Sequence, residues 1–300
     1  MSSVLILGNG FLGTRIFKSL NDVKGTGNVS TVQVFSKKEL DYTNVENIYR
    51  DDVIAPDIII NASGFTGQPN VDGCEQNKQE CWRLNTQVPV NLYDHCRHNG
   101  ILFIHISSGC IYSGYDKYFS EEDEPNFGMF SDVSSFYSKT KHAAELLMPL
   151  SSDLLTFRIR IPFTKDNTTR NYINKLLNYD NLISMDNSVT CVEDFVDMIT
   201  SLIHTRDIYK IPFGLYNACN PDPVNAEQVI SILKKHNLSN PNWSLIDITD
   251  LNTKANRSNC ILSTDKIQSI GDWFKPTMES LESSIECLSN DVFFSKKYSH

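Results

Sequence analysis

Long apolar runs, paired cysteines and an excess of positive charge are all missing from this 300-residue sequence. No run approaches the roughly 20 residues that a membrane-spanning helix needs, which excludes a protein built from such helices. The eight cysteines include no CxxC pair and lie mostly in apolar segments, so we expect no zinc site and a reducing, cytoplasmic location. The start, MSSVLILGNGFLG, lacks a basic segment before its apolar run, and we therefore expect no signal peptide.

Basic residues are outnumbered, 27 Lys and Arg against 36 Asp and Glu, for a formal net charge of -9. This balance is the reverse of the basic surface that binds nucleic acid, so we expect no DNA or RNA partner. An anionic small molecule remains compatible with it. Backbone amides and a few placed cations can hold phosphate within an acidic protein.

The first half of the chain alternates β-branched runs with helical stretches, which is typical of βαβ units around a parallel sheet. We predict an α/β fold of the Rossmann type: a doubly wound parallel sheet with a smaller C-terminal domain. The expected domains are residues 1–160, which bind the dinucleotide, and 161–300, mainly for substrate, with some segments returning to the sheet. Predicted strands cover residues 4–7, 32–35, 57–61, 102–107 and 155–159. Predicted helices cover residues 12–20, 45–50, 75–97, 135–147, 172–178, 192–204 and 226–235.

A GxGxxG sequence, Gly8 to Gly13, follows the first predicted strand and opens the first predicted helix. Gly8 permits the tight turn, Gly10 lets the backbone approach a pyrophosphate, and Gly13 lets the helix pack close to the sheet. A glycine-rich loop without function would have the same composition. Its place at the first strand of a βαβ series instead favours dinucleotide binding.

The end of the second predicted strand bears on the choice of dinucleotide. NAD sites usually place an acidic residue there, for the ribose 2′-hydroxyl. This chain has Ser36, Lys37 and Lys38 instead. A lysine pair is also common in a solvated turn, so the pattern favours NADPH while NADH stays the less favoured alternative.

Tyr137 and Lys141 are spaced i and i+4 on one predicted helix, and they follow the fourth predicted strand with its terminal Ser108. A nearby ammonium is expected to lower the pKa of Tyr137 from about 10, so that the phenol exchanges a proton with a substrate oxygen. Ser108 is placed to hydrogen-bond the same oxygen.

These motifs together resemble the extended short-chain dehydrogenase/reductase superfamily over the whole chain. Four stretches resemble more closely the bifunctional nucleotide-rhamnose synthase/epimerase-reductases of plants and giant viruses, relatives of dTDP-4-dehydrorhamnose reductase. They are NASGFTGQPNVD at 61–72, SGCIY at 108–112, SFYSKTK at 135–141 and RNYINK at 170–175. Those enzymes convert UDP-4-keto-6-deoxyglucose to UDP-L-rhamnose with NADPH.

The resemblance implies a role for each matching residue. Tyr137 would be the acid of ketone reduction, Lys141 its pKa partner and ribose ligand, and Ser108 the donor to the carbonyl. Cys110 and Lys175 match the acid and base of epimerisation. Asn85 matches a structural active-site asparagine. The implied cofactor contacts are Phe11, Leu12, Asp41, Asn61, Ala62 and Gly64, besides the residues given above, and the implied substrate contacts are Gln68, Asn171 and Arg257.

Two positions depart from the family pattern: Gly73 replaces a common Trp, and Ser63 replaces the second Ala of an NAAG sequence. Neither has a proton-transfer role. Without the resemblance, Cys110 is an ordinary small core residue and Lys175 a solvated lysine. If the strand stays extended beyond Ser108, Cys110 faces the same side as Ser108.

We therefore expect a bifunctional 3,5-epimerase and NADPH-dependent 4-keto-reductase. A reductase without epimerase activity is the nearest alternative, and a non-catalytic cofactor-binding subunit of the same fold is the other. The resemblance also implies a homodimer and an upstream 4,6-dehydratase that supplies the substrate. Whether UDP or dTDP carries the sugar stays open.

Overall fold

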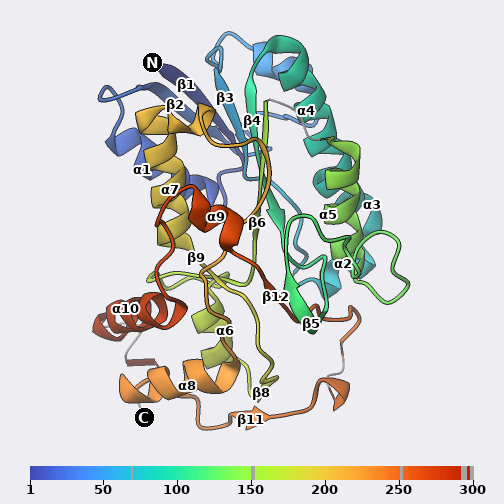
Figure 1. Cartoon of the computed structure of the whole chain (residues 1–300), viewed down its shortest axis with the longest axis vertical. Helices are drawn as coiled ribbons and strands as arrows, with labels where there is room; N and C mark the ends of the chain where they lie inside the picture. The colour runs from blue at the N-terminus through green and yellow to red at the C-terminus, as the bar shows by residue number, and fades with distance from the viewer. Residues whose placement is uncertain (69, 150–152, 251–252, 292–295, 298–300) are drawn as a thin grey trace.

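A computed structural model of the chain describes residues 1–68, 70–149, 153–250, 253–291 and 296–297; Pro69, inside one of the quoted stretches, lies outside them. Its centre is a six-stranded sheet in the order β10-β6-β4-β3-β1-β2, and every neighbouring pair is parallel. Helices cover both faces (Figure 1). The predicted fold class is confirmed.

The strands of this sheet are β1 (Ser2–Leu7), β2 (Val29–Phe35), β3 (Ile58–Asn61), β4 (Leu102–Ser108), β6 (Leu154–Ile159) and β10 (Gly214–Asn217). Shorter strands form three pairs: β5 (Gly114–Phe119) with β12 (Cys260–Leu262), β7 (Pro162–Phe163) with β9 (Thr190–Cys191), and β8 (Asn181–Leu182) with β11 (Ser244–Leu245). The helices are α1 (Gly13–Asp22), α2 (Asp72–Gln76), α3 (Lys78–Trp82), α4 (Val88–Asn99), α5 (Phe136–Leu147), α6 (Tyr172–Asn178), α7 (Val192–Thr205), α8 (Ala226–Lys235), α9 (Asp265–Ser269) and α10 (Thr277–Asn290). Short 3-10 turns occupy Val45–Tyr49, Asp207–Tyr209 and Ile248–Asp250, and a π-helical turn occupies Arg83–Gln87.

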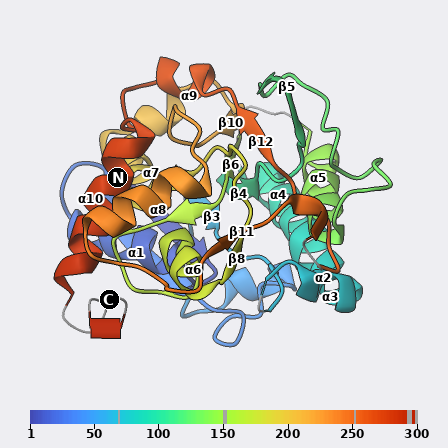
Figure 2. The same cartoon turned by 90° about the horizontal axis from the view of Figure 1, so that it is seen from below.

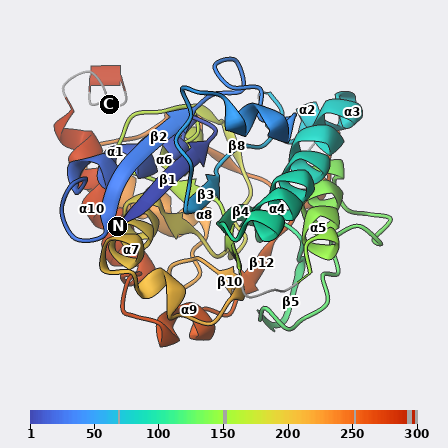
Figure 3. The same ribbon diagram turned by 90° about the horizontal axis from the view of Figure 1, so that it is seen from above.

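The sheet is buried on both faces because the side chains of its strands alternate between two apolar clusters. In β1, Val4 and Ile6 pack with α1 and α7, whereas Leu5 and Leu7 pack with α4 and α5. Figure 3 shows these two helical layers on opposite sides of the strands. Because both faces of the strand are buried, its sequence is a continuous apolar run and does not alternate with polar residues.

A third apolar cluster lies below the sheet and joins α6, α8 and α10 (Figure 2). All three helices come from the second half of the chain. That half also returns to the sheet, because β10 pairs with β6 and α7 packs against α1. The domain division at residue 160 stays a prediction.

Two predicted helices differ from the observed structure. Residues 45–49 form a 3-10 turn rather than an α-helix. The helix predicted over 75–97 is interrupted at Asn77 and at the π-helical turn that precedes α4. Pro89 lies in the first turn of α4, and since proline donates no backbone hydrogen bond, the preceding helix cannot continue through it in regular form.

The parallel arrangement brings the carboxyl ends of four strands to one edge. The register pairs Leu7 with Asn61, Asn61 with His105, and Ser108 with Ile159. The glycine turn after β1, the loop after β3 and the turn after β4 therefore meet there, as expected for ligand sites of open α/β sheets.

A buried ion pair fixes α5 to the sheet beside this edge. Arg158 of β6 donates to both carboxylate oxygens of Glu145, at 2.7–3.2 Å, and both side chains are at most 4% exposed. Ser107 of β4 donates to the same carboxylate at 2.5 Å. Because α5 carries Tyr137 and Lys141, this contact also positions the predicted catalytic residues.

Glu145→Ala should lower the free energy of unfolding by roughly 3–5 kcal/mol, because it leaves the buried guanidinium of Arg158 without its carboxylate. Urea denaturation followed by circular dichroism measures the loss. Glu282→Ala is the matched control, since Glu282 pairs with Lys235 at the surface and its removal should cause little change. Equal losses for the two variants would contradict this account.

Candidate functional site

The glycine turn after β1 has the tight geometry that its sequence predicts. Gly8 has φ of +102°, and a Cβ there would lie 2.8 Å from the backbone of Ser63. A Cβ on Gly13 would lie 1.8 Å from the carbonyl oxygen of Gly8, whereas one on Gly10 would meet nothing within 4 Å. The turn is thus closed at Gly8 and Gly13 and open at Gly10. Its open backbone, with Phe11 and Leu12 half-buried beyond it, fits a pyrophosphate.

An acidic side chain that the sequence prediction missed lies at the end of β2. The carboxylate of Glu39 accepts hydrogen bonds from the amide and hydroxyl of Ser36, at 2.8 and 2.7 Å, and from Asn9 at 3.3 Å. The ammonium of Lys37 pairs with Glu80 at 2.7 Å. Asp41 is exposed nearby, and the hydrogen bond from Thr43 lowers its pKa. The sequence predicts a basic turn after β2, from Lys37 and Lys38. The structure places the negative charge of Glu39 in the same turn.

Buried amides organise the loop after β3. Asn61 accepts from the amide and hydroxyl of Ser63, and its own amide contacts the ring of His105. Asn85 bonds the backbone of Phe65 in both directions, at 2.7 and 2.8 Å. Gly64 lies against Asn85, where a Cβ would come within 3.2 Å of its oxygen. Ala62 adjoins the glycine turn, so the loop and the turn form one surface.

Tyr137 lies beside Ser108, whose hydroxyl lowers the pKa of the phenol by donating toward its oxygen. Burial raises the pKa of Tyr137 above its ordinary value, and this outweighs the lowering effect of Ser108. The net shift is thus opposite in direction to the one expected from the neighbouring ammonium, and the role of Lys141 as pKa partner stays a prediction. Lys141 is buried and donates to the carbonyl of Ile106 at 3.1 Å. The site thus keeps the phenol protonated, which suits a proton donor.

Lys141 is itself shifted by its surroundings. Burial lowers its pKa to about 8, against the opposing effect of Glu145. The low value follows because a desolvated ammonium loses its hydration. The α5 helix that carries Tyr137 and Lys141 begins at Ser135, whose hydroxyl accepts from the amide of Ser138.

Cys110 lies just beyond the end of β4, in a turn rather than in an extended strand. The alternation argument for its orientation therefore does not apply. Its amide donates to the hydroxyl of Ser108 at 3.2 Å, and its carbonyl accepts from Ser138 at 2.5 Å. Burial is the main cause of the pKa shifts of Tyr137 and Lys175. The charge of a Cys110 thiolate raises the pKa of each. The turn thus brings the thiol close to both.

Lys175 is half-buried on α6 rather than fully solvated. Burial lowers its pKa, and the positive charges of Arg170 and Arg257 lower it further. These are the two effects that a lysine needs to act as a base near neutral pH. Arg170, which also bonds Thr66 of the loop after β3, is a further residue that the sequence prediction did not single out.

Arg257 lies at the edge of a cavity of about 300 Å³ lined also by Phe127, Val133, Ile248, Thr253 and Asn256. Its guanidinium pairs with Asp72 of α2 at 2.9 Å, and the same carboxylate accepts from the amide of Ala255. The C-terminal segment is thereby held against the loop after β3. Arg257 also lies near Lys175, so the cavity adjoins a cluster of positive charge.

Of the remaining predicted substrate residues, Gln68 is exposed and Asn171 is fully buried. Asn171 begins α6: its oxygen accepts from the amide of Ile173, and its nitrogen donates to the carbonyl of Thr164 at 2.6 Å. The side chain therefore shapes the start of the helix that carries Lys175.

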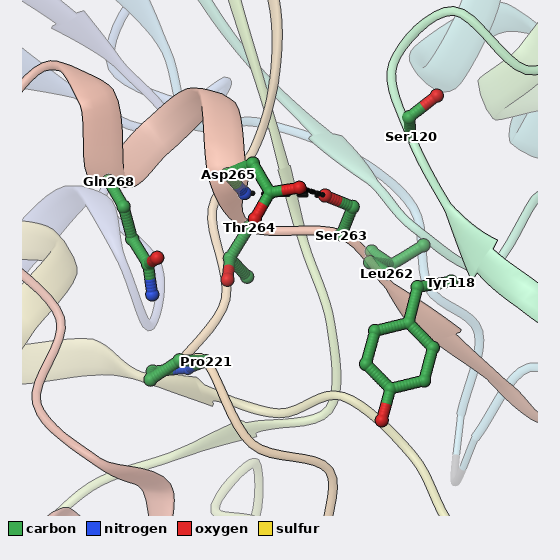
Figure 4. A pocket seen from close by; sticks show the side chains of 8 residues that line it. All are labelled: Tyr118, Ser120, Pro221, Leu262, Ser263, Thr264, Asp265 and Gln268. Atoms are coloured by element: carbon green, nitrogen blue, oxygen red, sulfur yellow. Dashed lines mark hydrogen bonds between the residues drawn. The ribbon is translucent and has the colours of Figure 1, made fainter.

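A larger cavity, of about 380 Å³, lies between the end of β5, the loop after β10, the end of β12 and the start of α9 (Figure 4). It is lined by Tyr118, Ser120, Pro221, Leu262, Ser263, Thr264, Asp265 and Gln268. None of the predicted site residues lines it. In the described ranges, no group of three His, Cys, Asp or Glu side chains is arranged to hold a metal, and no helix is both long and apolar enough to cross a membrane.

Relatives of known name resemble this chain over part of its length. It is 32% identical over 206 residues to a trifunctional UDP-glucose 4,6-dehydratase/UDP-4-keto-6-deoxy-D-glucose 3,5-epimerase/UDP-4-keto-L-rhamnose-reductase of Arabidopsis thaliana, covering 66% of this chain and 29% of that protein. It is 33% identical over 192 residues to a bifunctional dTDP-4-dehydrorhamnose 3,5-epimerase/dTDP-4-dehydrorhamnose reductase of the same plant, covering 61% of this chain and 60% of the relative. The aligned part is thus under a third of the first relative.

Solved structures share the fold. The L780 UDP-rhamnose synthase of Acanthamoeba polyphaga mimivirus has a TM-score of 0.80 at 24% identity, covering 95% of this chain and 99% of that one. A dTDP-4-dehydrorhamnose reductase of Bacillus anthracis, in complex with NADP, has a TM-score of 0.75 at 22% identity, covering 94% and 98%.

The family model described as the RmlD substrate binding domain matches residues 1–289, nearly the whole chain. The glycine turn, the ends of β3 and β4, and the start of α5 all lie within this match. The family-level resemblance drawn from the sequence motifs is confirmed, and the chain belongs to the RmlD substrate-binding-domain family.

Proposed function

We propose that this chain is an NADPH-dependent nucleotide-sugar enzyme that both epimerises and reduces its substrate. The substrate would be UDP-4-keto-6-deoxy-D-glucose, inverted at C3 and C5 and then reduced at C4 to UDP-L-rhamnose. The observation that carries the proposal is the grouping of Tyr137 and Ser108 with Cys110 and Lys175 at one edge of the sheet. The activities for which the two plant relatives are named support it.

The open backbone at Gly10 and the half-buried Phe11 and Leu12 fit the dinucleotide, with Ser36 and Lys37 nearest the place for its adenosine ribose. NADPH, when bound, supplies the hydride for reduction. The NADP complex of the related fold supports this choice of cofactor.

In the proposed reduction, Tyr137 holds the proton that the C4 oxygen needs, and Ser108 hydrogen-bonds the same oxygen. In the proposed epimerisation, the C4 ketone makes the protons on C3 and C5 acidic. Lys175 removes a proton from one face, and Cys110 returns one to the other face. Donors at the C4 oxygen stabilise the enolate in one reaction and the alkoxide in the other. One carbonyl site thus serves both.

The cation cluster supports a nucleotide diphosphate as part of the substrate. After burial, the positive charges of Arg170 and Arg257 lower the pKa of Lys175, and Arg257 lies at the edge of a cavity. In this proposal Arg257 holds the diphosphate, and the exposed side chain of Gln68 contacts the substrate. Asn171 acts indirectly, because its side chain fixes the start of α6.

The proposal extends to the surroundings of the enzyme. An upstream 4,6-dehydratase would supply the keto-sugar, and the trifunctional plant relative is named for that activity as well. The eight cysteines are all free thiols, which supports a reducing, cytoplasmic compartment. A homodimer rests on the resemblance alone, and sedimentation of the purified protein tests it.

Incubation with UDP-4-keto-6-deoxyglucose and NADPH, followed by NMR of the sugar, tests the reaction as a whole. UDP-L-rhamnose is the expected product. Reduction without inversion would favour the reductase alternative, and no oxidation of NADPH with either UDP- or dTDP-linked substrate would favour a non-catalytic subunit.

Tyr137→Phe should reduce the rate of ketone reduction by a factor on the order of 10² or more, because the proton donor is lost while the ring stays. Stopped-flow fluorescence of NADPH measures the rate. Tyr216→Phe, which removes a buried phenol that bonds Pro212, is the matched control and should keep the wild-type rate. A near-normal rate in folded Tyr137→Phe would exclude Tyr137 as the acid.

Cys110→Ala and Lys175→Ala should each suppress deuterium uptake from solvent at C3 and C5, by a factor on the order of 10² or more. Both should still reduce a 4-keto-rhamnose nucleotide that is already epimerised. NMR in deuterated buffer measures uptake, with Cys287→Ala and Lys234→Ala as exposed controls. Wild-type uptake in either folded variant would return that residue to a structural role.

The same experiment has a pH dependence. Lys175 accepts a proton only when neutral, so uptake should rise with pH through its pKa. Arg170→Gln removes a positive charge that lowers this pKa, and the rise should therefore move to higher pH. An unchanged profile would separate Lys175 from the proton transfer.

The wild-type protein should have a higher kcat/KM with NADPH than with NADH. Glu39→Gln should raise the NADPH to NADH ratio roughly five- to tenfold, since it removes a negative charge beside Ser36, and Lys37→Gln should lower it. Steady-state kinetics with both cofactors measure the ratio. Glu46→Gln, an exposed nearby change, is the control. Equal or better use of NADH by the wild type would overturn the preference.

A further inference from the structure

Arg160, directly after β6, is a buried cation that has no carboxylate partner among the residues that the structure describes. It is 1% exposed, and its Nη2 donates to Asn187 at 2.5 Å and to the carbonyl of Ser258 at 2.7 Å. Its Nη1 donates to the hydroxyl of Ser258 at 2.9 Å and to Sγ of Cys110 at 3.5 Å, and lies 3.3 Å from the carbonyl of Gly109. All of these acceptors are uncharged as long as Cys110 is a thiol. Its Nε has no partner among the described residues.

Arg158 provides the comparison within the same strand. It is 2% exposed and is neutralised by the carboxylate of Glu145. A buried cation is costly unless an anion pairs with it. The two arginines differ in this respect. Arg158 has its anion permanently. Arg160 gains one from Cys110 when that thiol loses its proton.

The guanidinium of Arg160 is held in place by its surroundings. Its backbone amide donates to the hydroxyl of Thr190 at 2.9 Å. Ile161, the next residue, has φ of +39°, a left-handed conformation that is costly for a β-branched side chain. Together with the bonds to Asn187 and Ser258, these features fix the guanidinium at the sulfur of Cys110.

We propose that Arg160 is the positioning residue that lets Cys110 act as an acid, by stabilising the thiolate that proton donation leaves behind. This inference rests on the proposed epimerase function. The C–H bond on one face breaks, and its proton forms an N–H bond on neutral Lys175. The S–H bond of Cys110 breaks as a new C–H bond forms on the opposite face. The resulting ammonium and thiolate balance in charge, and proton exchange with solvent restores both.

Other ionisable groups also face Cys110. They are Tyr137 and Lys141 from α5, Lys175 from α6, Cys260 from β12 and Cys219 after β10. In the part of the chain that the structure describes, Arg160 is the cation that hydrogen-bonds the sulfur directly. Its effect on the thiolate should therefore exceed that of the two lysines.

The test measures thiolate formation without turnover. In a Cys287→Ser background, the rate of alkylation of Cys110 by neutral iodoacetamide is followed against pH, with the modified peptide identified by mass spectrometry. Arg160→Gln should lower the rate at pH 7 by on the order of tenfold and move the profile to higher pH by about one unit. Arg160→Lys keeps a positive charge and should retain part of the rate.

Two further variants separate charge from folding. Arg97→Gln removes a guanidinium that pairs with Asp94 at the surface and does not contact Cys110, and its alkylation profile should match the parent. Asn187→Asp is isosteric and places a carboxylate against Arg160, so it should move the profile to higher pH even if Arg160→Gln fails to fold. An unchanged profile in folded Arg160→Gln, or in Asn187→Asp, would overturn the proposal.

The outcome is distinguishable from failure of the proposed function. If the wild-type protein shows no deuterium uptake while Arg160→Gln still shifts alkylation, the pairing of Arg160 with the thiolate stands and the epimerase function falls. If uptake occurs and neither variant shifts alkylation, the function stands and the role of Arg160 falls.

Discussion

Desolvation of ionisable side chains is the constraint on which the site depends. Burial raises the pKa of Tyr137 and lowers those of Lys141 and Lys175. A phenol is thereby kept as a proton donor, and the neutral form of an amine becomes accessible. Both shifts come from one cause, since removing water disfavours the charged form of either group. The same burial makes a permanent charge costly unless an anion pairs with it, as Glu145 does for Arg158.

The local parts of this arrangement could be predicted from the sequence, because they depend on residues close together in the chain. The glycine turn, the strands before it and after it, and the helices α6 and α8 follow from spacing and periodicity. The interruption before α4 was not predicted, although Pro89 was its local signal. The apolar pattern of residues 75–97 predicts one helix, because such a pattern does not show where the backbone hydrogen bonds of a helix are interrupted.

Contacts between residues far apart in the chain could not be predicted from local spacing. Glu39 accepts a hydrogen bond from Asn9 in the glycine turn, 30 residues earlier. Arg160 meets Ser258 and Asn187 across separations of 98 and 27 residues, respectively. The short strand pairs of the second half are two or three residues long in most cases, too short for alternation to be recognised. A strand that ends at Ser108 likewise cannot be told in advance from one that continues to Cys110.

The two departures from the family pattern have a physical account in the loop after β3. A Cβ at residue 73 would lie 2.5 Å from the amide nitrogen of Gln68, so this backbone path leaves no room for a larger residue at Gly73. The hydroxyl of Ser63 donates to Asn61 at 2.6 Å, a bond that alanine lacks. At the other end of the loop, Asn85 bonds the backbone of Phe65 in both directions. A buried amide side chain, Asn61 or Asn85, therefore holds each end of the loop beside the glycine turn.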